Sequence, residues 1–279
     1  MHDNANIPGS PQKSGKKGQT IGIISLKGGV GKTSSVANLG AALSSEFGKK
    51  VLVVDANFSA PNLALHLGLV NPEATIHDVL LDNADAEDAI YEHSSGIHLM
   101  PGSYISRKIN PFRLKQKISH LKDNYDFIII DSSPNLNDEM LSTMIASDRL
   151  FVVTSPDYPT LSTTLRAVRL AKQKKTPIAG LILNRVRNKK FELTLKEIED
   201  AAEVPVVSVL PEDISVIESL ASTTPVSIHR PKANASVEYK KLAAALVGQR
   251  YKDTRLWPRL KGFFVKDMAK DNINRLLMK

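Results

Sequence analysis

Cysteine is absent from the 279 residues of the chain, and this absence excludes several kinds of site. Without thiols the chain forms no disulfide, ligates no metal through cysteine and holds no iron–sulfur cluster of its own. The sequence also has no run of about 18 or more apolar residues, so we expect no membrane-spanning helix. Residues 1–19 lack the apolar core of a secretory signal peptide, which favours a cytosolic protein.

The bulk composition, 42% hydrophobic and 24% charged, fits one globular domain that buries a large core. The formal net charge is +8, and it is concentrated at the two ends of the chain. Residues 1–19 hold three lysines against one aspartate, and residues 250–279 hold nine lysines and arginines against three aspartates. The middle of the chain is therefore neutral, and its basic C-terminal tail suggests contact with an anionic surface.

Three regions follow from these patterns. Residues 1–19 are rich in Gly, Pro, Ser, Asn and Lys, and we expect a disordered basic extension there. Residues 20–248 alternate short apolar runs with helical spacing, and we expect them to form the folded domain. Residues 249–279 form a basic, partly amphipathic tail.

The apolar runs of the central region predict buried strands. They are near-continuous stretches of Val, Ile and Leu, as expected for strands covered on both faces: 21–26, 51–54, 97–100, 127–130, 150–154, 178–183 and 206–209. Helical spacing occurs between them, for example at 34–47, 114–121 and 161–170. This alternation predicts an α/β fold, a doubly wound and mostly parallel sheet with helices on both faces. Ligands of such sheets bind at the carboxyl ends of the strands.

A glycine-rich segment separates the first expected strand from the helix that opens at Ser34. It reads Lys27-Gly28-Gly29-Val30-Gly31-Lys32-Thr33. A turn of this kind directs backbone N–H groups and the positive end of a helix dipole at phosphate. Its glycines let the backbone approach the anion, Lys32 can reach the outer phosphates, and the Thr33 hydroxyl can bind Mg²⁺. We therefore expect residues 28–34 to bind a nucleotide.

Two aspartates end buried strands near this turn. Asp55 follows 51–54, and Asp131 follows 127–130. A carboxylate at the end of a strand beside a phosphate loop is placed for Mg²⁺ or its waters. The alternative for each residue alone is a cap at a strand or helix end. Because both aspartates occur together with the glycine-rich turn, we favour Thr33, Asp55 and Asp131 as the magnesium site.

Together these segments resemble the MinD/ParA family of P-loop ATPases, and MinD-like members most. The first glycine of the ordinary P-loop pattern is replaced here by Leu26, and Lys27 follows it, as in the deviant Walker A motif K-G-G-x-G-K-T. Residues 55–69 resemble the switch I segment of MinD-like proteins, and residues 126–135 resemble a Walker B strand with switch II. The resemblance covers about residues 20–248.

The resemblance implies an ATPase that uses ATP and Mg²⁺ and closes into a homodimer around two nucleotides. Lys27 would then enter the partner's site, and Lys32 would act within its own. Asn184 and the segment containing Pro211 and Asp213 are expected to contact the adenine. The chain departs from the family at Asn57, where switch I carries a second acid associated with the attacking water. An amide can hydrogen-bond a water but carries no negative charge, so we expect slow hydrolysis.

The cellular role implied by the resemblance is spatial: positioning of a division or other apparatus at a membrane, with a cargo or activator protein as partner. In the tail, Leu260, Phe263, Phe264 and Met268 share one face of a helix, which favours an anionic membrane surface over docking on protein. We thus expect a cytoplasmic, peripherally membrane-associated protein. Two alternatives stay open: a ParA-like partition ATPase that binds DNA through basic residues between 166 and 190, and a nucleotide-locked scaffold with little turnover.

Overall fold

The computed structural model describes residues 17–105, 107–253 and 255, and its strands follow the apolar runs of the sequence. The central strands are buried along most of their length, because helices cover both faces of the sheet. The strands are β1 (Gln19–Ile24), β2 (Val51–Ala56), β3 (Tyr91–Glu92), β4 (His98–Met100), β5 (Phe127–Ser132), β6 (Arg149–Thr154), β7 (Ile178–Val186) and β8 (Val206–Pro211).

These strands form one sheet in the order β3-β4-β2-β5-β1-β6-β7-β8. Within the described part of the chain, every neighbouring pair is parallel except β3 with β4, which is antiparallel. The strand order reverses direction around β1, and such a reversal creates a crevice at the carboxyl ends of the strands. The predicted doubly wound α/β fold is confirmed.

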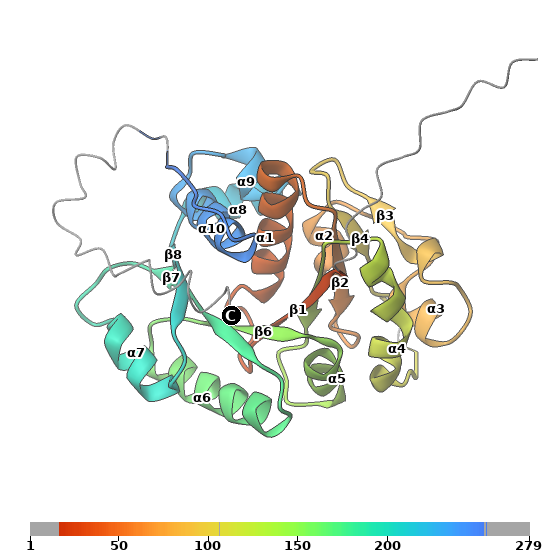
Figure 1. Ribbon diagram of the computed structural model, residues 1–279, viewed down its shortest axis with the longest axis horizontal. Coiled ribbons are helices and arrows are strands. Elements are labelled where there is room, and N and C mark those ends of the chain that lie inside the picture. Colours follow the sequence, from red (N-terminus) through yellow and green to blue (C-terminus); the bar gives the residue numbers. More distant parts are fainter. Residues whose placement is uncertain (1–16, 106, 254, 256–279) are drawn as a thin grey trace, which may run out of the picture.

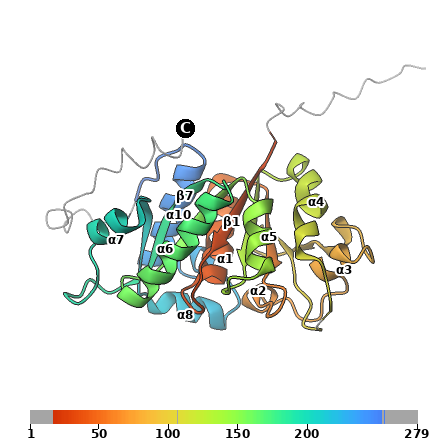
Figure 2. The same ribbon diagram turned by 90° about the horizontal axis from the view of Figure 1, so that it is seen from below.

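The longer helices lie in two layers on the two faces of the sheet (Figures 1 and 2). They are α1 (Lys32–Phe47), α5 (Asp138–Ala146), α6 (Tyr158–Gln173), α7 (Leu195–Ala202), α8 (Ile214–Ala221) and α10 (Asn234–Leu246). Short helices complete the layers: α2 (Leu63–His66), α3 (Ile76–Leu80), η1 (Glu87–Ala89), η2 (Pro111–Arg113), α4 (Leu114–Ile118), η3 (Ser119–Asp123) and α9 (Val226–His229).

The core divides according to these two layers. On one face, α1, α2 and α10 pack against alternate strand residues such as Ile21, Val53 and Ile129. On the other face, α3 and α4 cover residues such as Ile128, while α5, α6 and α7 cover the β6–β7 side of the sheet. Because successive strand side chains point to opposite faces, one continuous apolar run supplies both cores.

The seven expected strands are all present, each within three residues of its predicted bounds. The pattern missed β3, since a two-residue antiparallel edge strand has too few residues to show a period. The helix expected at 114–121 is α4 followed by the 3₁₀ turn η3. Strand β1 begins at Gln19, one residue before the expected start of the folded domain at 20.

Among the described residues, no helix combines the length and apolarity that crossing a bilayer demands. Most of the two ends of the sequence, residues 1–16 and 256–279, lies outside the described residues. The amphipathic face expected from Leu260 to Met268 is part of that segment.

Candidate nucleotide and magnesium site

The glycine-rich turn runs from the carboxyl end of β1 into the N-terminus of α1. Gly29 and Gly31 have φ of 72° and 101°, in the left-handed region that favours glycine. A Cβ added to Gly28 or Gly29 would meet no atom within 4 Å, so the turn leaves an open cradle there. A Cβ on Gly31 would lie 2.2 Å from Asn184 Nδ2, so this position excludes any side chain.

The first turn of α1 is built to accept an anion. Its N-cap is Gly31, which supplies no side-chain cap for the helix N–H groups. The Lys32 side chain lies inside the turn, 7% exposed, with Nζ 3.5 Å from the Lys27 carbonyl oxygen. Burial lowers the pKa of Lys32, although the nearby Asp131 carboxylate opposes this shift. The charge of the anion that such a turn binds would favour the ammonium form.

The two predicted metal carboxylates are neighbours across the sheet. Asp55 of β2 pairs in register with Asp131 of β5, and both are fully buried. Burial raises the pKa of Asp55 to about 8, and repulsion from Asp131 adds to the shift. Burial also raises the pKa of Asp131 to about 6, against the opposing effect of a hydrogen bond from Thr33. Two adjacent buried carboxyls without a cation favour protonation of at least one of them.

The donor set fits Mg²⁺. Thr33 Oγ1 lies 2.6 Å from Asp131 Oδ2 and 3.1 Å from Asn62 Oδ1. The other Asp131 oxygen, Oδ1, is buried and has no hydrogen-bond partner among the described residues. A hydroxyl and a carboxylate oxygen with a free lone pair are ligands that Mg²⁺ takes directly or through water. Thr33 and Asp131 would therefore hold the ion.

Asp55 has a second task that the sequence did not reveal. Its Oδ1 accepts a hydrogen bond from the backbone N–H of Asn57 at 3.1 Å, and its Oδ2 accepts from the N–H groups of Asn62 and Leu63, both at 2.9 Å. Asp55 thus folds the switch I segment around its own carboxylate. Any metal contact of Asp55 would use its remaining lone pairs.

Asn57 is turned into its own loop. The side chain is 8% exposed, and its Nδ2 donates a hydrogen bond of 2.5 Å to the Ala60 carbonyl oxygen. An aspartate at this position could not donate that bond, and it would add a third carboxylate close to Asp55. The amide therefore suits the local structure of switch I.

Lys27 stands at the rim of the turn and is held by the start of α6. Its side chain is 41% exposed, with Nζ 3.4 Å from Asp157 Oδ1 and within hydrogen-bonding distance of Thr160 Oγ1. Asp157 is the N-cap of α6 and accepts from the Thr160 N–H at 2.9 Å. Burial acts to raise the pKa of Asp157, but hydrogen bonds from Ser155 and Thr160 and the charge of Lys27 outweigh it and lower the value to about 2.

The residues expected at the adenine come from β7, the end of β8 and the N-cap of α8. Asn184 in β7 donates from Nδ2 to the Val30 carbonyl oxygen at 2.7 Å, so its amide ties β7 to the glycine-rich turn. Pro211 ends β8, and Asp213 is the N-cap of α8, where its Oδ1 accepts from the Ser215 N–H at 3.0 Å. The fold brings Asn184 to the turn, whereas Asp213 is engaged in capping.

The remaining residues of the predicted loop have mainly structural surroundings. Val30 is 3% exposed and packs in the core, so only its backbone would be available to a phosphate. The Ser34 carbonyl oxygen accepts from Asn38 Nδ2 at 2.7 Å within α1.

The sequence reasoning missed three partners of the site. Asp157 could have been found from the Asp-Tyr-Pro sequence, since an N-cap aspartate with proline in the first turn marks a helix start. Asn62 lies in a loop, and only the fold brings it to Thr33. The hydrogen bond from Ser59 of switch I to Glu139 of α5 joins residues 80 apart, so no local pattern announces it.

The chain is similar to known proteins over most of its length. The family model described as an AAA domain matches residues 18–178. An uncharacterized ATP-binding protein of Methanocaldococcus jannaschii is 38% identical over 234 residues, which cover 83% of this chain and 88% of that protein. The family-model match covers the part of the chain that carries the turn and both aspartates.

Two solved structures are similar in fold and sequence. The cell division ATPase MinD of Pyrococcus furiosus has a TM-score of 0.77 and 35% identity, and the match covers 81% of this chain and 97% of that one. The septum site-determining protein MinD of Pyrococcus horikoshii, complexed with Mg-ADP, has a TM-score of 0.77, 33% identity and coverage of 89% and 99%. ATP and Mg²⁺ are accordingly the cofactors. With its deviant Walker A turn and paired strand-end aspartates, the chain belongs to the MinD/ParA family of P-loop ATPases.

Proposed function

We propose that the protein is a slow ATPase that dimerises on Mg·ATP and serves as a spatial switch at a membrane. The observation that carries the proposal is that the turn holds two lysines of different exposure, one buried and one partly exposed. Lys32 is enclosed with the phosphate cradle, whereas Lys27 stands at its rim with a side chain 41% exposed. A lysine at the rim can serve a second nucleotide site, and the buried one cannot.

Within one subunit, the residues divide the work on the triphosphate. Backbone N–H groups of residues 28–34 would cradle the phosphates, and Lys32 would neutralise their charge. Thr33 and Asp131 would hold Mg²⁺, which supplies charge neutralisation at the β- and γ-phosphate oxygens. Asp55 would keep switch I folded against this group through its three backbone hydrogen bonds.

Dimerisation would complete the site. Lys27 would leave Asp157 and Thr160 and enter the partner's site, where it neutralises charge that develops on the transferred phosphoryl group, as an arginine finger does in other NTPases. The contact it leaves is a partly exposed ion pair, which costs little to break. The dimer would thus be the active state, and hydrolysis would release it.

Attachment to a membrane would depend on residues 249–279, whose basic and apolar side chains suit an anionic lipid surface. One such segment binds weakly, so two per dimer would link attachment to ATP through avidity. The protein would be cytoplasmic and peripherally membrane-associated, with a cargo or activator protein as a further partner.

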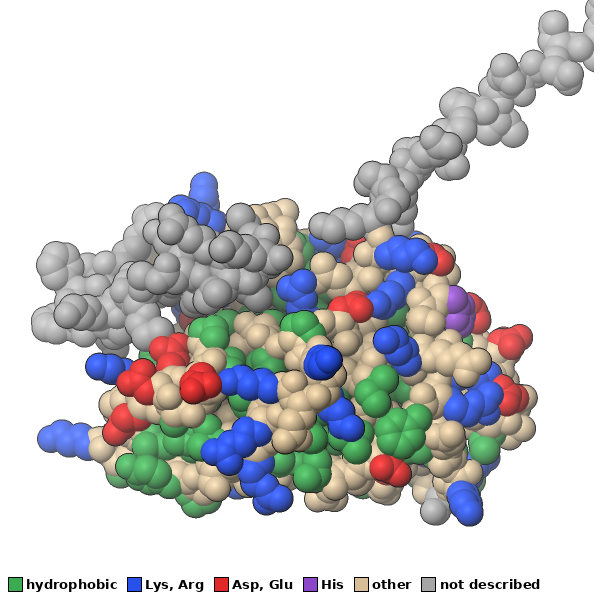
Figure 3. Space-filling model, turned by 60° about the horizontal axis from the view of Figure 1, so that its bottom comes forward, with side chains coloured by type: hydrophobic (Ala, Val, Ile, Leu, Met, Phe, Trp, Pro, Cys, Tyr) green, Lys and Arg blue, Asp and Glu red, His purple; other side chains and the backbone are tan. Residues whose placement is uncertain are grey.

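DNA binding through the face that carries α6 and α7 is less favoured. Figure 3 shows the basic side chains of the facing surface mixed with acidic and apolar ones. Two members of the basic group are already paired, Arg187 with Glu212 at 2.6 Å and Lys172 with Glu203 at 2.8 Å. This pairing dilutes the positive field that phosphate binding requires.

The second candidate is a nucleotide-locked scaffold with little turnover, and Asn57 favours it. The amide is buried and bonded to the Ala60 carbonyl oxygen, so it neither carries charge nor points freely at a water. ATP would then close the dimer and keep it closed until a partner supplied the missing group.

ATP turnover measured together with molecular mass separates these candidates. We would compare the wild type with Lys27→Ala, Asn57→Asp and Asn57→Ala, with Mg·ATP and with ATP alone. If the protein is a switch, the wild type should form an ATP-dependent dimer and hydrolyse ATP slowly, and Lys27→Ala should abolish the hydrolysis. If the protein is a scaffold, the wild type should form the dimer with negligible ATP turnover, and Asn57→Asp should accelerate that turnover. The matched Asn57→Ala variant shows whether any gain comes from the carboxylate or from loss of the bond to Ala60.

Lipid attachment is tested by co-sedimentation with anionic liposomes, with and without ATP. The chain ending at residue 249 should lose ATP-dependent sedimentation. Persistent lipid binding by that truncated chain would contradict the role of the tail, and a monomer with Mg·ATP would contradict the dimer.

A further inference from the structure

Helix α8 exposes three of its large apolar side chains. Ile214, Ile217 and Leu220 are 66%, 64% and 44% exposed, whereas the helix buries Ser219, which is 4% exposed. Positions 214, 217 and 220 lie on one side of a helix, because three residues advance it by almost a full turn. A surface helix normally turns its apolar side to the core, so α8 presents a surface suited to a partner.

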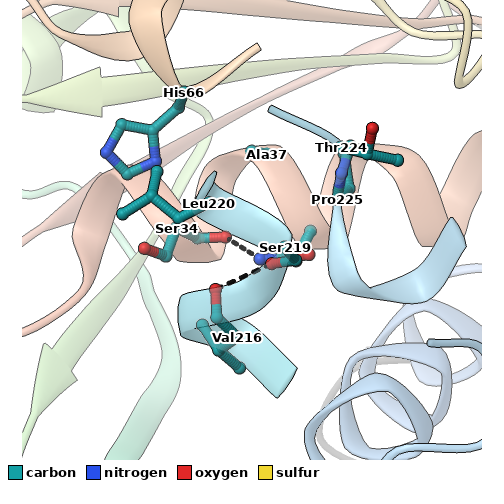
Figure 4. Close-up of a pocket in the computed structure, with 9 residues that line it drawn as sticks. Ser34, Ala37, His66, Val216, Ser219, Leu220, Thr224 and Pro225 are labelled. Atoms are coloured by element: carbon teal, nitrogen blue, oxygen red, sulfur yellow. Dashed lines mark hydrogen bonds between the residues drawn. The ribbon is translucent and has the colours of Figure 1, made fainter. Parts of the chain in front are cut away.

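Residues of α2 and the loop after it extend this apolar surface. Leu65 is 52% exposed and Val70 is 67% exposed. His66 of α2 and Leu220 of α8 line the same small pocket over Ser34 of α1, and Figure 4 shows these side chains around it. Figure 2 places α2 and α8 along the same edge of the molecule. We call Leu65, Val70, Ile214, Ile217 and Leu220 the α2–α8 patch.

The last described residue contacts the start of α10, which in turn contacts the N-cap of α8. Arg255, its last described residue, donates from Nη1 to Asn234 Oδ1 at 2.7 Å at the start of α10. The next residue, Ala235, donates from its N–H to Asp213 Oδ2 at 3.2 Å, and Asp213 is the N-cap of α8. Two contacts therefore connect Arg255 to the residue before Ile214.

We propose that residues 256–279 dock on the α2–α8 patch of their own subunit. This segment contains Leu260, Phe263, Phe264 and Met268, whose spacing would place them on one side of a helix. Its 24 residues would span about 36 Å as a helix, at about 1.5 Å per residue, and α8 has eight residues. The segment is thus long enough to cover the patch from its point of attachment.

The tether favours this occupant over a free protein. A short linker holds its segment at an effective concentration on the order of millimolar, so modest apolar contacts suffice for docking. Docking has a consequence for the switch proposed above. An apolar face that is covered by α8 cannot insert into lipid, so docking would keep the tail away from the membrane until it is displaced.

Disulfide trapping tests the proposal directly, because the chain contains no cysteine. We would introduce Ile217→Cys together with Phe264→Cys into the full chain, and oxidise it without nucleotide at low protein concentration. The matched control pairs Phe264→Cys with Glu203→Cys, an exposed residue at the end of α7. Ile217 and Glu203 are both exposed, so both variants should fold, which circular dichroism would verify.

The expected result is an intramolecular disulfide that forms at least tenfold faster in the Ile217 pair than in the Glu203 pair, at a rate independent of dilution. Equal rates in the two pairs would overturn the proposal. A linked band of twice the mass would overturn it too, since the patch would then belong to a second copy. The outcome does not depend on ATP turnover or lipid, so it can succeed where the membrane role fails.

Discussion

The contact between Lys27 and Asp157 makes a quantitative prediction about dimerisation. Asp157→Asn should strengthen the ATP-dependent dimer. Asparagine caps a helix as well as aspartate does, so α6 keeps its N-cap while Lys27 loses the charge that holds it. If Lys27 must leave this contact to reach the partner's nucleotide, the free energy of the contact opposes dimerisation.

The magnitude follows from the exposure of the pair. The two side chains are 41% and 43% exposed, and the Nζ–Oδ1 distance is 3.4 Å. A pair this open to solvent contributes about 0.2–1 kcal/mol. Two lysines leave such contacts per dimer, which gives about 0.4–2 kcal/mol and a dimer about 2- to 30-fold tighter. High salt should tighten the wild-type dimer towards the variant, because salt screens the pair.

Sedimentation velocity with Mg²⁺ and a non-hydrolysable ATP analogue measures this effect. Asp157→Ala is the control, since it removes the charge and also the cap, which costs about 1 kcal/mol of stability. The lowered pKa of Asp157 adds a second readout. The stability that it contributes is present above its unfolded value near 3.8 and is lost as the pH falls towards 2. The Asp157→Asn variant should not show this loss of folding stability at low pH. A weaker dimer in Asp157→Asn would refute the reasoning and place Asp157 in the dimer contact itself.

Two further predictions concern the turn and the paired carboxyls. Gly31→Ala should abolish ATP binding and destabilise the fold by about 1–3 kcal/mol, because its φ is 101° and its Cβ would lie 2.2 Å from Asn184 Nδ2. Isothermal titration and thermal melts check this, and Gly48→Ala, at a φ of 59° with open space around its Cβ, should retain binding. Because the pKa of Asp55 is raised to about 8, the magnesium-free protein should be most stable below pH 4 as far as this group is concerned, and should lose stability as the pH rises towards 8. Asp131→Asn removes the neighbouring charge and should flatten this slope in melts with EDTA; an unchanged slope would contradict the coupling of the two carboxyls.

The fold class could be predicted from the amino-acid sequence alone, and so could the residues proposed for the centre of the site. Continuous apolar runs fixed the buried strands because both faces of a parallel sheet require them. The segment from Lys27 to Thr33 predicts a phosphate-binding turn, because the residues of this motif are adjacent in the sequence and lie between a strand and a helix. Asp55 and Asp131 followed because each ends such a run, and the register of β2 with β5 then set them side by side.

Contacts between distant segments could not be predicted from the sequence and required the three-dimensional structure. It assigned Lys27 to Asp157, 130 residues away, and Asn184 to the Val30 carbonyl oxygen, 154 residues away. It turned Asn57 into its own loop and left three large apolar side chains of α8 exposed. Local pattern fixes where a strand or helix forms, because backbone geometry and apolar periodicity act over a few residues. The partner of a side chain depends on which strand ends the sheet order brings together, and that order is settled only when the whole core packs.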